Sequence, residues 1–61
     1  MRLKELRTKK GLTQQEVAKA IGYSVKTYAH YEQGIREPNI STLKLLSRYF
    51  GVSIDHILHN D

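Results

Sequence analysis

Four glycines limit the length of every regular element that this chain of 61 residues can form. Gly11, Gly22, Gly34 and Gly51 each follow a stretch in which apolar residues recur at helical spacing. Glycine in this position is typical of a helix end, because a residue without a Cβ atom adopts the left-handed backbone that closes many helices. The glycines therefore divide the chain into five short segments, each of which we expect to be helical.

Residues that favour helix starts stand at the beginning of the segments that the glycines delimit. Thr13 is followed three residues later by Glu16, the pattern of a capping box, and Ser24 and Ser53 are placed to cap later helices. Asn39 precedes the remaining apolar stretch. The sequence predicts a compact all-α fold with a single domain over residues 1–61. We expect its five helices at about 2–10, 14–21, 25–33, 40–50 and 54–59.

The apolar residues in these segments follow spacings of three and four, which fit helices and no strand. Tyr28 and Tyr31 share the apolar face of their segment, so we interpret them as core residues and not as platforms on which single-stranded bases stack. The apolar residues that follow helical spacing are Leu3, Leu6, Val17, Ala18, Ile21, Tyr28, Tyr31, Ile40, Leu43, Leu46, Phe50, Ile54, Ile57 and Leu58.

Composition argues against several classes of protein. The chain has no cysteine for disulfides or thiolate metal sites, and no apolar run approaches the ~20 residues of a membrane span. The N-terminal stretch MRLKELRTKK is charged throughout, unlike a signal peptide. We therefore expect a soluble cytoplasmic protein that folds without a cofactor.

Neither catalysis nor metal binding is predicted. No nucleophile stands in a recognisable motif, and a domain of this size leaves little room for a substrate pocket. His56 and His59 lie three residues apart on the last expected helix, but without a third strong ligand we interpret them as part of a polar face. We expect no enzyme activity, no small-molecule substrate and no metal.

Positive charge is concentrated in the first part of the chain. Residues 1–36 carry eight basic and three acidic side chains, a net charge of +5, whereas the remainder carries −1, which gives +4 in all. A basic half beside a nearly neutral half is typical of a surface that faces a polyanion, with a separate end for packing or pairing. An ordinary solvated surface is the alternative, since charge alone permits nucleic-acid binding without establishing it.

Residues 12–34 contain two expected helices separated by the three residues Gly22-Tyr23-Ser24, which is the helix-turn-helix arrangement. Helices that cross steeply at so short a turn need a small residue at the crossing, which Ala18 supplies. The turn itself needs a residue that tolerates positive φ, which Gly22 supplies. The face of the second helix that remains outward carries Val25, Lys26, Ala29, His30 and Gln33, with Ser24 and Thr27 at its start.

Several stretches of the chain resemble one known family. They are LTQQEVAKAIG in the first motif helix, Tyr31-Glu32-Gln33-Gly34 at the end of the second, Pro38 after the following loop, and LLSRYFGVSIDHIL near the C-terminus. Together they resemble the phage-repressor and Cro type of helix-turn-helix protein, the lambda-repressor-like or XRE family, over nearly the whole chain. The resemblance implies a five-helix fold whose third helix lies in the major groove of double-stranded DNA.

Carried over by position, the resemblance implies roles for the outward residues of that helix. Lys26 would donate to guanine O6 and N7, and Val25 and Ala29 would contact a thymine methyl group. His30 would donate to a base or a phosphate. The third helix would thus read the base edges of the major groove.

The resemblance also implies contacts with the DNA backbone. Gln14 and the helix N-terminus that follows it would hold a phosphate. Arg7 and Glu32 match a family ion pair between the first and third helices, with the guanidinium edge near a phosphate. The remaining expected phosphate contacts are Ser24, Thr27, Gln33 and Arg36. Tyr23 departs from the family pattern, which has a smaller residue there, so the tilt of the third helix is not implied.

These features predict a sequence-specific transcriptional regulator that binds a palindromic operator as a homodimer. A domain with little spare surface favours repression, because it can occlude promoter DNA. We expect the near-neutral C-terminal part to form the dimer surface, with candidates Leu45, Tyr49, Ile57, Leu58 and His59.

Two other hypotheses remain open from the sequence. One is an antitoxin-like or adaptor module whose main partner is a protein. The other is an architectural protein that binds any duplex through its phosphates alone.

Overall fold

The computed structural model describes residues 1–59, and within this range the chain forms five α-helices and no strand, as predicted. The helices are α1 (Leu3–Lys9), α2 (Gln14–Ile21), α3 (Val25–Gln33), α4 (Ile40–Phe50) and α5 (Ile54–Leu58). The three middle helices have the expected bounds. Helix α1 is one residue shorter than expected at each end, and α5 ends one residue early, because Arg2, Lys10 and His59 are cap residues.

Every helix after α1 begins at a side-chain cap. The Thr13 hydroxyl accepts from the N–H of Glu16 (3.1 Å), and the Glu16 carboxylate accepts from the N–H of Thr13 (2.8 Å), which completes the predicted capping box. Ser24, Asn39 and Ser53 each accept from the N–H three residues further on. Each such cap stabilises a helix by about 1 kcal/mol, a large share of the stability of so small a domain.

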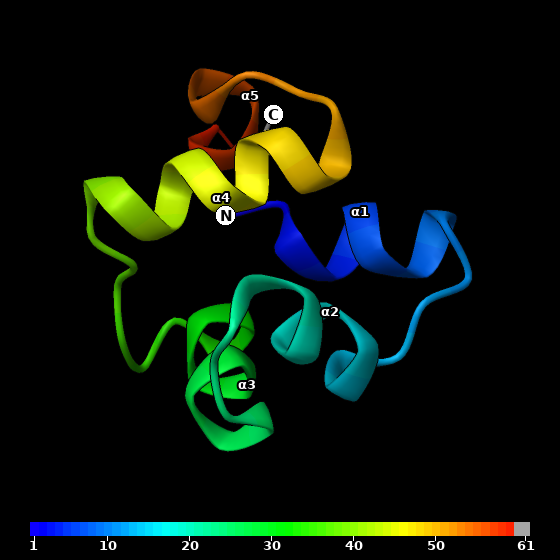
Figure 1. Ribbon diagram of the computed structural model, residues 1–61. Coiled ribbons are helices and arrows are strands. Elements are labelled where there is room, and N and C mark those ends of the chain that lie inside the picture. Colours follow the sequence, from blue (N-terminus) through cyan, green and yellow to red (C-terminus); the bar gives the residue numbers. More distant parts are fainter. Residues whose placement is uncertain (60–61) are drawn as a thin grey trace.

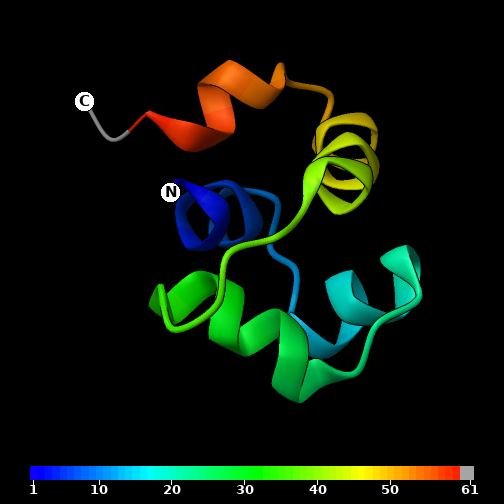
Figure 2. The ribbon, with the colours of Figure 1, turned by 90° about the vertical axis from the view of Figure 1, so that its left-hand side faces the viewer.

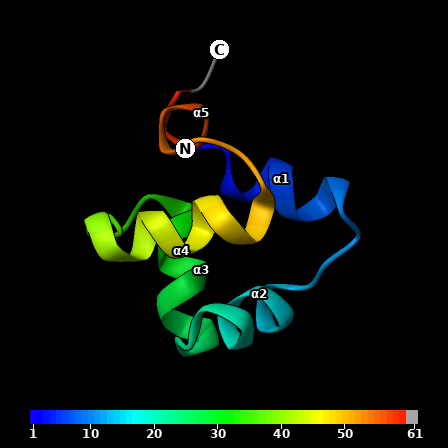
Figure 3. The ribbon, with the colours of Figure 1, turned by 45° about the horizontal axis from the view of Figure 1, so that its top comes forward.

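Helices α2 and α3 lie together at one end of the molecule, α5 lies at the other end, and α1 and α4 lie between them (Figure 1). A view from the side shows the same order (Figure 2). Helix α4 runs across the molecule between α5 and the α2–α3 pair (Figure 3). Helix α2 packs against both α3 and α4, and α1 reaches α3, so α3 is held from its inner side.

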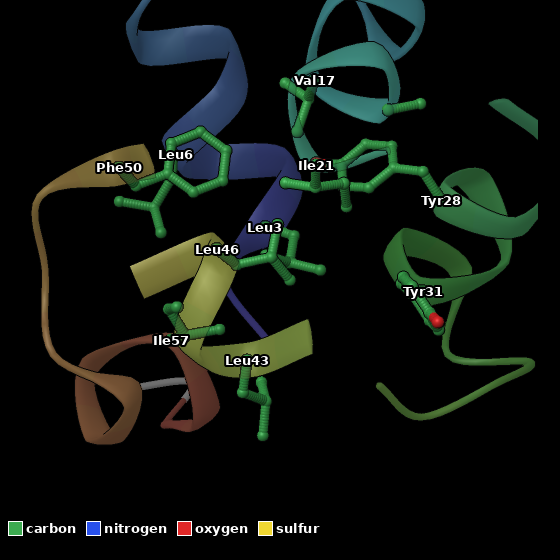
Figure 4. Close-up of a cluster of buried hydrophobic side chains, with 11 residues drawn as sticks. Leu3, Leu6, Val17, Ile21, Tyr28, Tyr31, Leu43, Leu46, Phe50 and Ile57 are labelled. Atoms are coloured by element: carbon green, nitrogen blue, oxygen red, sulfur yellow. The ribbon is translucent and has the colours of Figure 1, made fainter. Parts of the chain in front are cut away.

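One cluster of buried side chains joins the five helices (Figure 4). Tyr28 and Tyr31 belong to this cluster, as predicted, at 0% and 3% exposure. Each helix contributes one hydrophobic side chain that is 0% exposed: Leu3, Val17, Tyr28, Leu46 and Ile57.

Two of the apolar residues at helical spacing lie outside the core. Ile40 is 62% exposed and Leu58 is 45% exposed. Ile40 is the first residue of α4 and Leu58 the last of α5, so both lie at helix ends beyond the neighbouring helices. Helical spacing alone does not tell where the packing partner of a helix ends.

The N-terminus is attached to α5. The backbone N–H of Arg2 donates to the carbonyl of Ile57 (2.9 Å), and Nε of Arg2 donates to the carbonyl of His59 (2.6 Å). The prediction that Ile57 lies on a dimer surface is wrong, because its side chain is 0% exposed and belongs to the buried cluster. The other candidates for that surface are exposed: Leu45, Tyr49, Leu58 and His59.

The turn between α2 and α3 is closed by the backbone. The N–H of Tyr23 donates to the carbonyl of Ala18 (2.9 Å), and the chain reverses at Gly22, whose φ is 81°. Ala18 is 1% exposed, as expected for the small residue at a helix crossing. These residues fix the angle at which α3 leaves α2.

Three side chains tie this turn to α4. The Tyr23 hydroxyl lies 2.6 Å from Oγ1 of Thr42, and that Oγ1 donates to Oδ1 of Asn39 (3.0 Å). Thr42 has one hydroxyl hydrogen and Asn39 Oδ1 can only accept, so Tyr23 is the donor to Thr42. Thr42 is 0% exposed, which makes its hydroxyl costly to leave without partners. This network could not be predicted from the sequence, because nothing in the spacing of the chain brings residues 23 and 42 together.

We expect Thr42→Val to lower the free energy of unfolding by about 1–3 kcal/mol, because it removes the acceptor of the Tyr23 hydroxyl. Tyr23→Phe removes the donor and should cost less. The losses in the double variant should fall short of their sum by about 1 kcal/mol, measured by urea unfolding. Strict additivity of the two losses would contradict a direct Tyr23–Thr42 bond.

Candidate nucleic-acid interface

The outer face of α3 is accessible to solvent. Val25 is 46% exposed, and Lys26 and Gln33 are also exposed. Ala29 and His30 are half-buried on the same helix. This face therefore presents a cation, small apolar groups and polar groups side by side, a set that suits the edges of bases.

Two hydroxyl groups at the start of α3 differ in their hydrogen bonds. Ser24 Oγ accepts from the N–H of Thr27 (3.2 Å) and donates to Oγ1 of Thr27 (3.0 Å). The hydroxyl hydrogen of Ser24 is thereby used within the protein. Thr27 keeps its own hydroxyl hydrogen, so it is the better placed of the two to donate to an external acceptor.

A buried ion pair holds the last turn of α3 against α1. Nε of Arg7 donates to Oε2 of Glu32 at 2.6 Å, and Nη2 donates to Oε1 at 3.2 Å, so the pair is bidentate. The two side chains are only 13% and 3% exposed. Nη1 of Arg7 donates to the carbonyl of Leu12 (2.8 Å). One guanidinium group thus joins α1, the α1–α2 connection and α3.

Gln14 adds α2 to the same cluster. Its Nε2 donates to Oε1 of Glu32 at 3.1 Å, so the first turn of α2 is tied to the last turn of α3. Gln14 is half-buried, with part of its side chain at the surface. Its position at the start of α2 also places it beside backbone N–H groups that no residue within the helix accepts from.

The Tyr28 hydroxyl is buried close to this ion pair. Among the described residues it has no partner in hydrogen-bonding geometry, although Arg7 and Glu32 are near enough to act on it electrostatically. Burial raises the pKa of Tyr28 far above its ordinary value, so the phenol stays neutral.

The Glu32 carboxylate is stabilised in its charged form. Burial by itself would raise the pKa of Glu32, but the hydrogen bond from Arg7 and the other donors around the carboxylate lower it below its ordinary value. The hydrogen bond to Glu32 likewise raises the pKa of Arg7. Both partners are therefore charged at neutral pH, and each would be left unpaired in the interior if the other were removed.

The remaining expected contact residue follows α3. Arg36 is exposed in the loop between α3 and α4, and its N–H donates to the carbonyl of His30 (3.3 Å). Lys9 and Lys10 are exposed at the end of α1.

Within residues 1–59 no helix is long and apolar enough to cross a membrane, and no three His, Cys, Asp or Glu side chains are grouped to hold a metal.

Two helices joined by a three-residue turn, with the second helix held from inside and open outside, define the helix-turn-helix class of DNA-binding proteins. The helix-turn-helix family profile matches residues 3–57. The chain belongs to this family, and the resemblance to phage-repressor proteins is confirmed by its relatives.

Three relatives illustrate the similarity. An uncharacterized prophage-derived HTH-type transcriptional regulator of Bacillus subtilis, YonR, is 46% identical over 57 residues, which cover 93% of this chain and 53% of that protein. The cryptic phage CTXphi transcriptional repressor RstR of Vibrio cholerae is 35% identical, with coverages of 93% and 51%. The transcriptional activator BcrR of Enterococcus faecalis is 37% identical, with coverages of 98% and 29%.

The chain spans about half the length of the first two of these relatives. No solved structure matches it significantly. The similarity therefore concerns the helix-turn-helix domain that the relatives share with this chain.

The structure brings together some of the expected site residues and separates others. Arg7, Gln14 and Glu32 form one connected cluster, whereas Lys26 and Val25 lie apart from it on the outer face of α3. The ion pair was expected from the family resemblance, whereas the bond from Arg7 to the Leu12 carbonyl was not predicted. No sequence signal marks a backbone carbonyl as an acceptor for a distant guanidinium.

We expect Glu32→Gln to lower the free energy of unfolding at pH 7 by more than about 1 kcal/mol, because Arg7 would lose its buried counter-charge. The pKa of Glu32 is lowered in the folded state, so this stabilisation is full above the ordinary carboxyl pKa of about 4.3. It should be lost as the pH falls through the lower, folded-state pKa. Urea unfolding between pH 7 and pH 2 measures both effects.

Glu5→Gln provides the matched control, since Glu5 is exposed on α1. This variant should keep the stability of the unaltered protein and its decline in acid. The Glu32→Gln variant should show a shallower decline. Equal acid sensitivity in the Glu32→Gln variant and the unaltered chain would contradict the electrostatic role of the pair.

Proposed function

We propose that this chain is the DNA-binding domain of a transcriptional regulator that recognises particular double-stranded sequences, with α3 in the major groove. The observation that carries the proposal is the division of α3 into two sides. Its inner side is fixed by buried contacts to α1 and α2, while its outer side is exposed. A rigid helix with an open face can enter the major groove at a defined angle.

The outer face of α3 supplies the base contacts in this proposal. Lys26 donates to guanine O6 and N7, and Val25 and Ala29 contact thymine methyl groups. His30 donates to a base or a phosphate. The apolar members of this set favour sequence readout over architectural binding, because an aliphatic group has no affinity for phosphate.

Groups around α3 supply the phosphate contacts. Arg7 uses three of its five N–H hydrogens within the described residues, so two remain for a phosphate oxygen. Gln14 and the N-terminus of α2 hold a second phosphate. Further contacts come from Ser24, Thr27, Gln33 and Arg36, among which Thr27 has a hydroxyl hydrogen to donate.

Repression by occluding promoter DNA is the regulatory action that we propose, with a homodimer on a palindromic operator. One relative is named a transcriptional repressor and another a transcriptional activator, so the fold itself serves both outcomes. A second copy doubles the contacts with DNA, and two-fold symmetry requires half-sites about one helical turn apart.

Selection from random duplexes should yield a palindromic sequence. Fluorescence anisotropy should then show binding to it at least ~10³-fold tighter than to a scrambled duplex. Affinity for both should fall as salt rises, because phosphate contacts release counterions. Equal, salt-sensitive affinity for both would identify an architectural protein, and no binding to either would favour a protein partner.

Lys26→Ala should weaken binding to the selected duplex by about 5- to 150-fold, the range expected for a lost bidentate base contact, and should relax the preference at one base position. Lys44→Ala is the matched control, since Lys44 is an exposed lysine on α4. It should change affinity by less than about twofold at the same salt concentration. Equal losses in the two variants would show that Lys26 acts only through general charge.

A further inference from the structure

Tyr23, in the turn of the helix-turn-helix, has neighbours on three helices. It is half-buried and packs against the core. Its hydroxyl lies 2.6 Å from Oγ1 of Thr42 on α4, and its ring centre lies 6.1 Å from that of Tyr31 on α3. It also lines an open cleft on α2 and the start of α3, together with Gln15, Ala18, Lys19 and Val25. The side chain of Tyr23 therefore stands where α2, α3 and α4 come together.

The bond from Tyr23 to Thr42 links the start of α3 to α4. Helix α4 itself packs mainly against α2 and α5. The backbone N–H of Tyr23 donates to Ala18, which ties the turn to α2. Among the hydrogen bonds of residues 1–59, the Tyr23–Thr42 bond is the one that joins the turn to α4. Apolar packing is non-directional, whereas a hydrogen bond requires a defined distance and angle.

Thr42 offers the Tyr23 hydroxyl an acceptor in a fixed position. Its side chain is 0% exposed and lies in the first turn of α4. Oγ1 of Thr42 donates to Oδ1 of Asn39 (3.0 Å), and the same Oδ1 accepts from the N–H of Thr42 (2.9 Å). The hydroxyl hydrogen of Thr42 is thereby used, and its branched side chain has few rotamers. The position of the Tyr23 hydroxyl is therefore set by α4.

A contact at the start of α3 controls the placement of the expected base-reading residues. Lys26 lies in the first turn of α3, whereas Glu32, which is bonded to α1 and α2, lies in the last turn. The helical rise separates these two residues by about 9 Å, so a tilt of about 10° around the Glu32 end moves Lys26 by about 1.6 Å. Binding groups need placement within about 0.5 Å. The ion pair at the far end thus leaves a tilt that the Tyr23–Thr42 bond removes.

We propose that the Tyr23–Thr42 bond sets the selectivity of α3 for base sequence. Tyr23 and Thr42 are positioning residues, since neither contacts DNA in the proposed function and both hold the first turn of α3 at the tilt that Lys26 requires. This inference rests on the proposed DNA-binding function. Phosphate contacts position the protein without reading sequence, so loss of the bond weakens binding to the selected duplex and spares binding to a scrambled duplex.

Anisotropy titrations of Tyr23→Phe and Thr42→Val with the selected and scrambled duplexes test the proposal. Each variant should lower the ratio of the two affinities by about tenfold, within the range for a lost bidentate base contact. The salt dependence of binding to the scrambled duplex should stay the same, because the phosphate contacts remain. The double variant should lower the ratio no further than either single variant, because all three remove the same bond.

A loss of stability alone does not give this result. Partial unfolding reduces the binding-competent fraction and lowers both affinities by the same factor, so their ratio is unaffected. Val52→Ala is the matched control, because Val52 is half-buried in the α4–α5 connection and packs against the core. This variant should unfold at lower urea concentration and keep the ratio within about twofold. Thr42→Ser retains the hydroxyl and should also keep the ratio.

Residual dipolar couplings of the free protein provide a readout that requires no DNA. In the unaltered chain, one alignment should fit the backbone N–H couplings of α1, α3 and α4. In Tyr23→Phe the couplings of α3 should depart from the alignment that fits α1 and α4. In Val52→Ala they should still fit it.

Selective binding by the unaltered chain with the same affinity ratio in Tyr23→Phe and Thr42→Val would overturn this inference alone. An equal fall of the ratio in Val52→Ala would also overturn it, because instability would then account for the effect. Couplings of α3 that still fit the alignment of α4 in Tyr23→Phe would do the same. Failure of the unaltered chain to select any duplex would overturn the proposed function and this inference together.

Discussion

The buried contact between Arg7 and Glu32 is the constraint on which the rest of the structure depends. It joins the first and third helices through two hydrogen bonds, and Gln14 brings the second helix to the same carboxylate. A buried ion pair adds little net stability compared with apolar packing, but breaking it leaves an uncompensated charge in the interior. Its main effect in this structure is on geometry, because it joins α1, α2 and α3 at a single carboxylate.

A second set of polar contacts holds α3 at its other end. The hydroxyl of Tyr23, in the turn before α3, reaches Thr42 and through it Asn39, the cap of α4. Helix α3 is thus fixed at its start by α4 and near its end by α1 and α2. In the proposed function, a helix that is already held at both ends loses little conformational freedom on binding DNA, which favours affinity and selectivity alike.

The composition of the molecular surface differs from one side to another. The open face of α3 combines Lys26 with apolar and polar groups, and most of the other basic residues of the chain belong to its first 36 residues. The groove beside the end of α3 is lined mainly by apolar residues, together with Glu37 and Asn39. In the proposed function the first surface meets a polyanion, which its positive charge suits.

The sequence by itself determined the local structure of this protein. Caps such as Thr13 and Ser24, and glycines after each apolar stretch, act through bonds within a few residues, so their effect can be deduced from spacing. The ion pair of Arg7 and Glu32 came from the family resemblance, since no local rule relates residues 25 positions apart. Only the tertiary structure decided that Ile57 is buried, that Ile40 and Leu58 are exposed, and that Thr42 bonds Tyr23. These outcomes depend on where neighbouring helices end and how they cross, because burial is a property of the assembled core and not of any one segment.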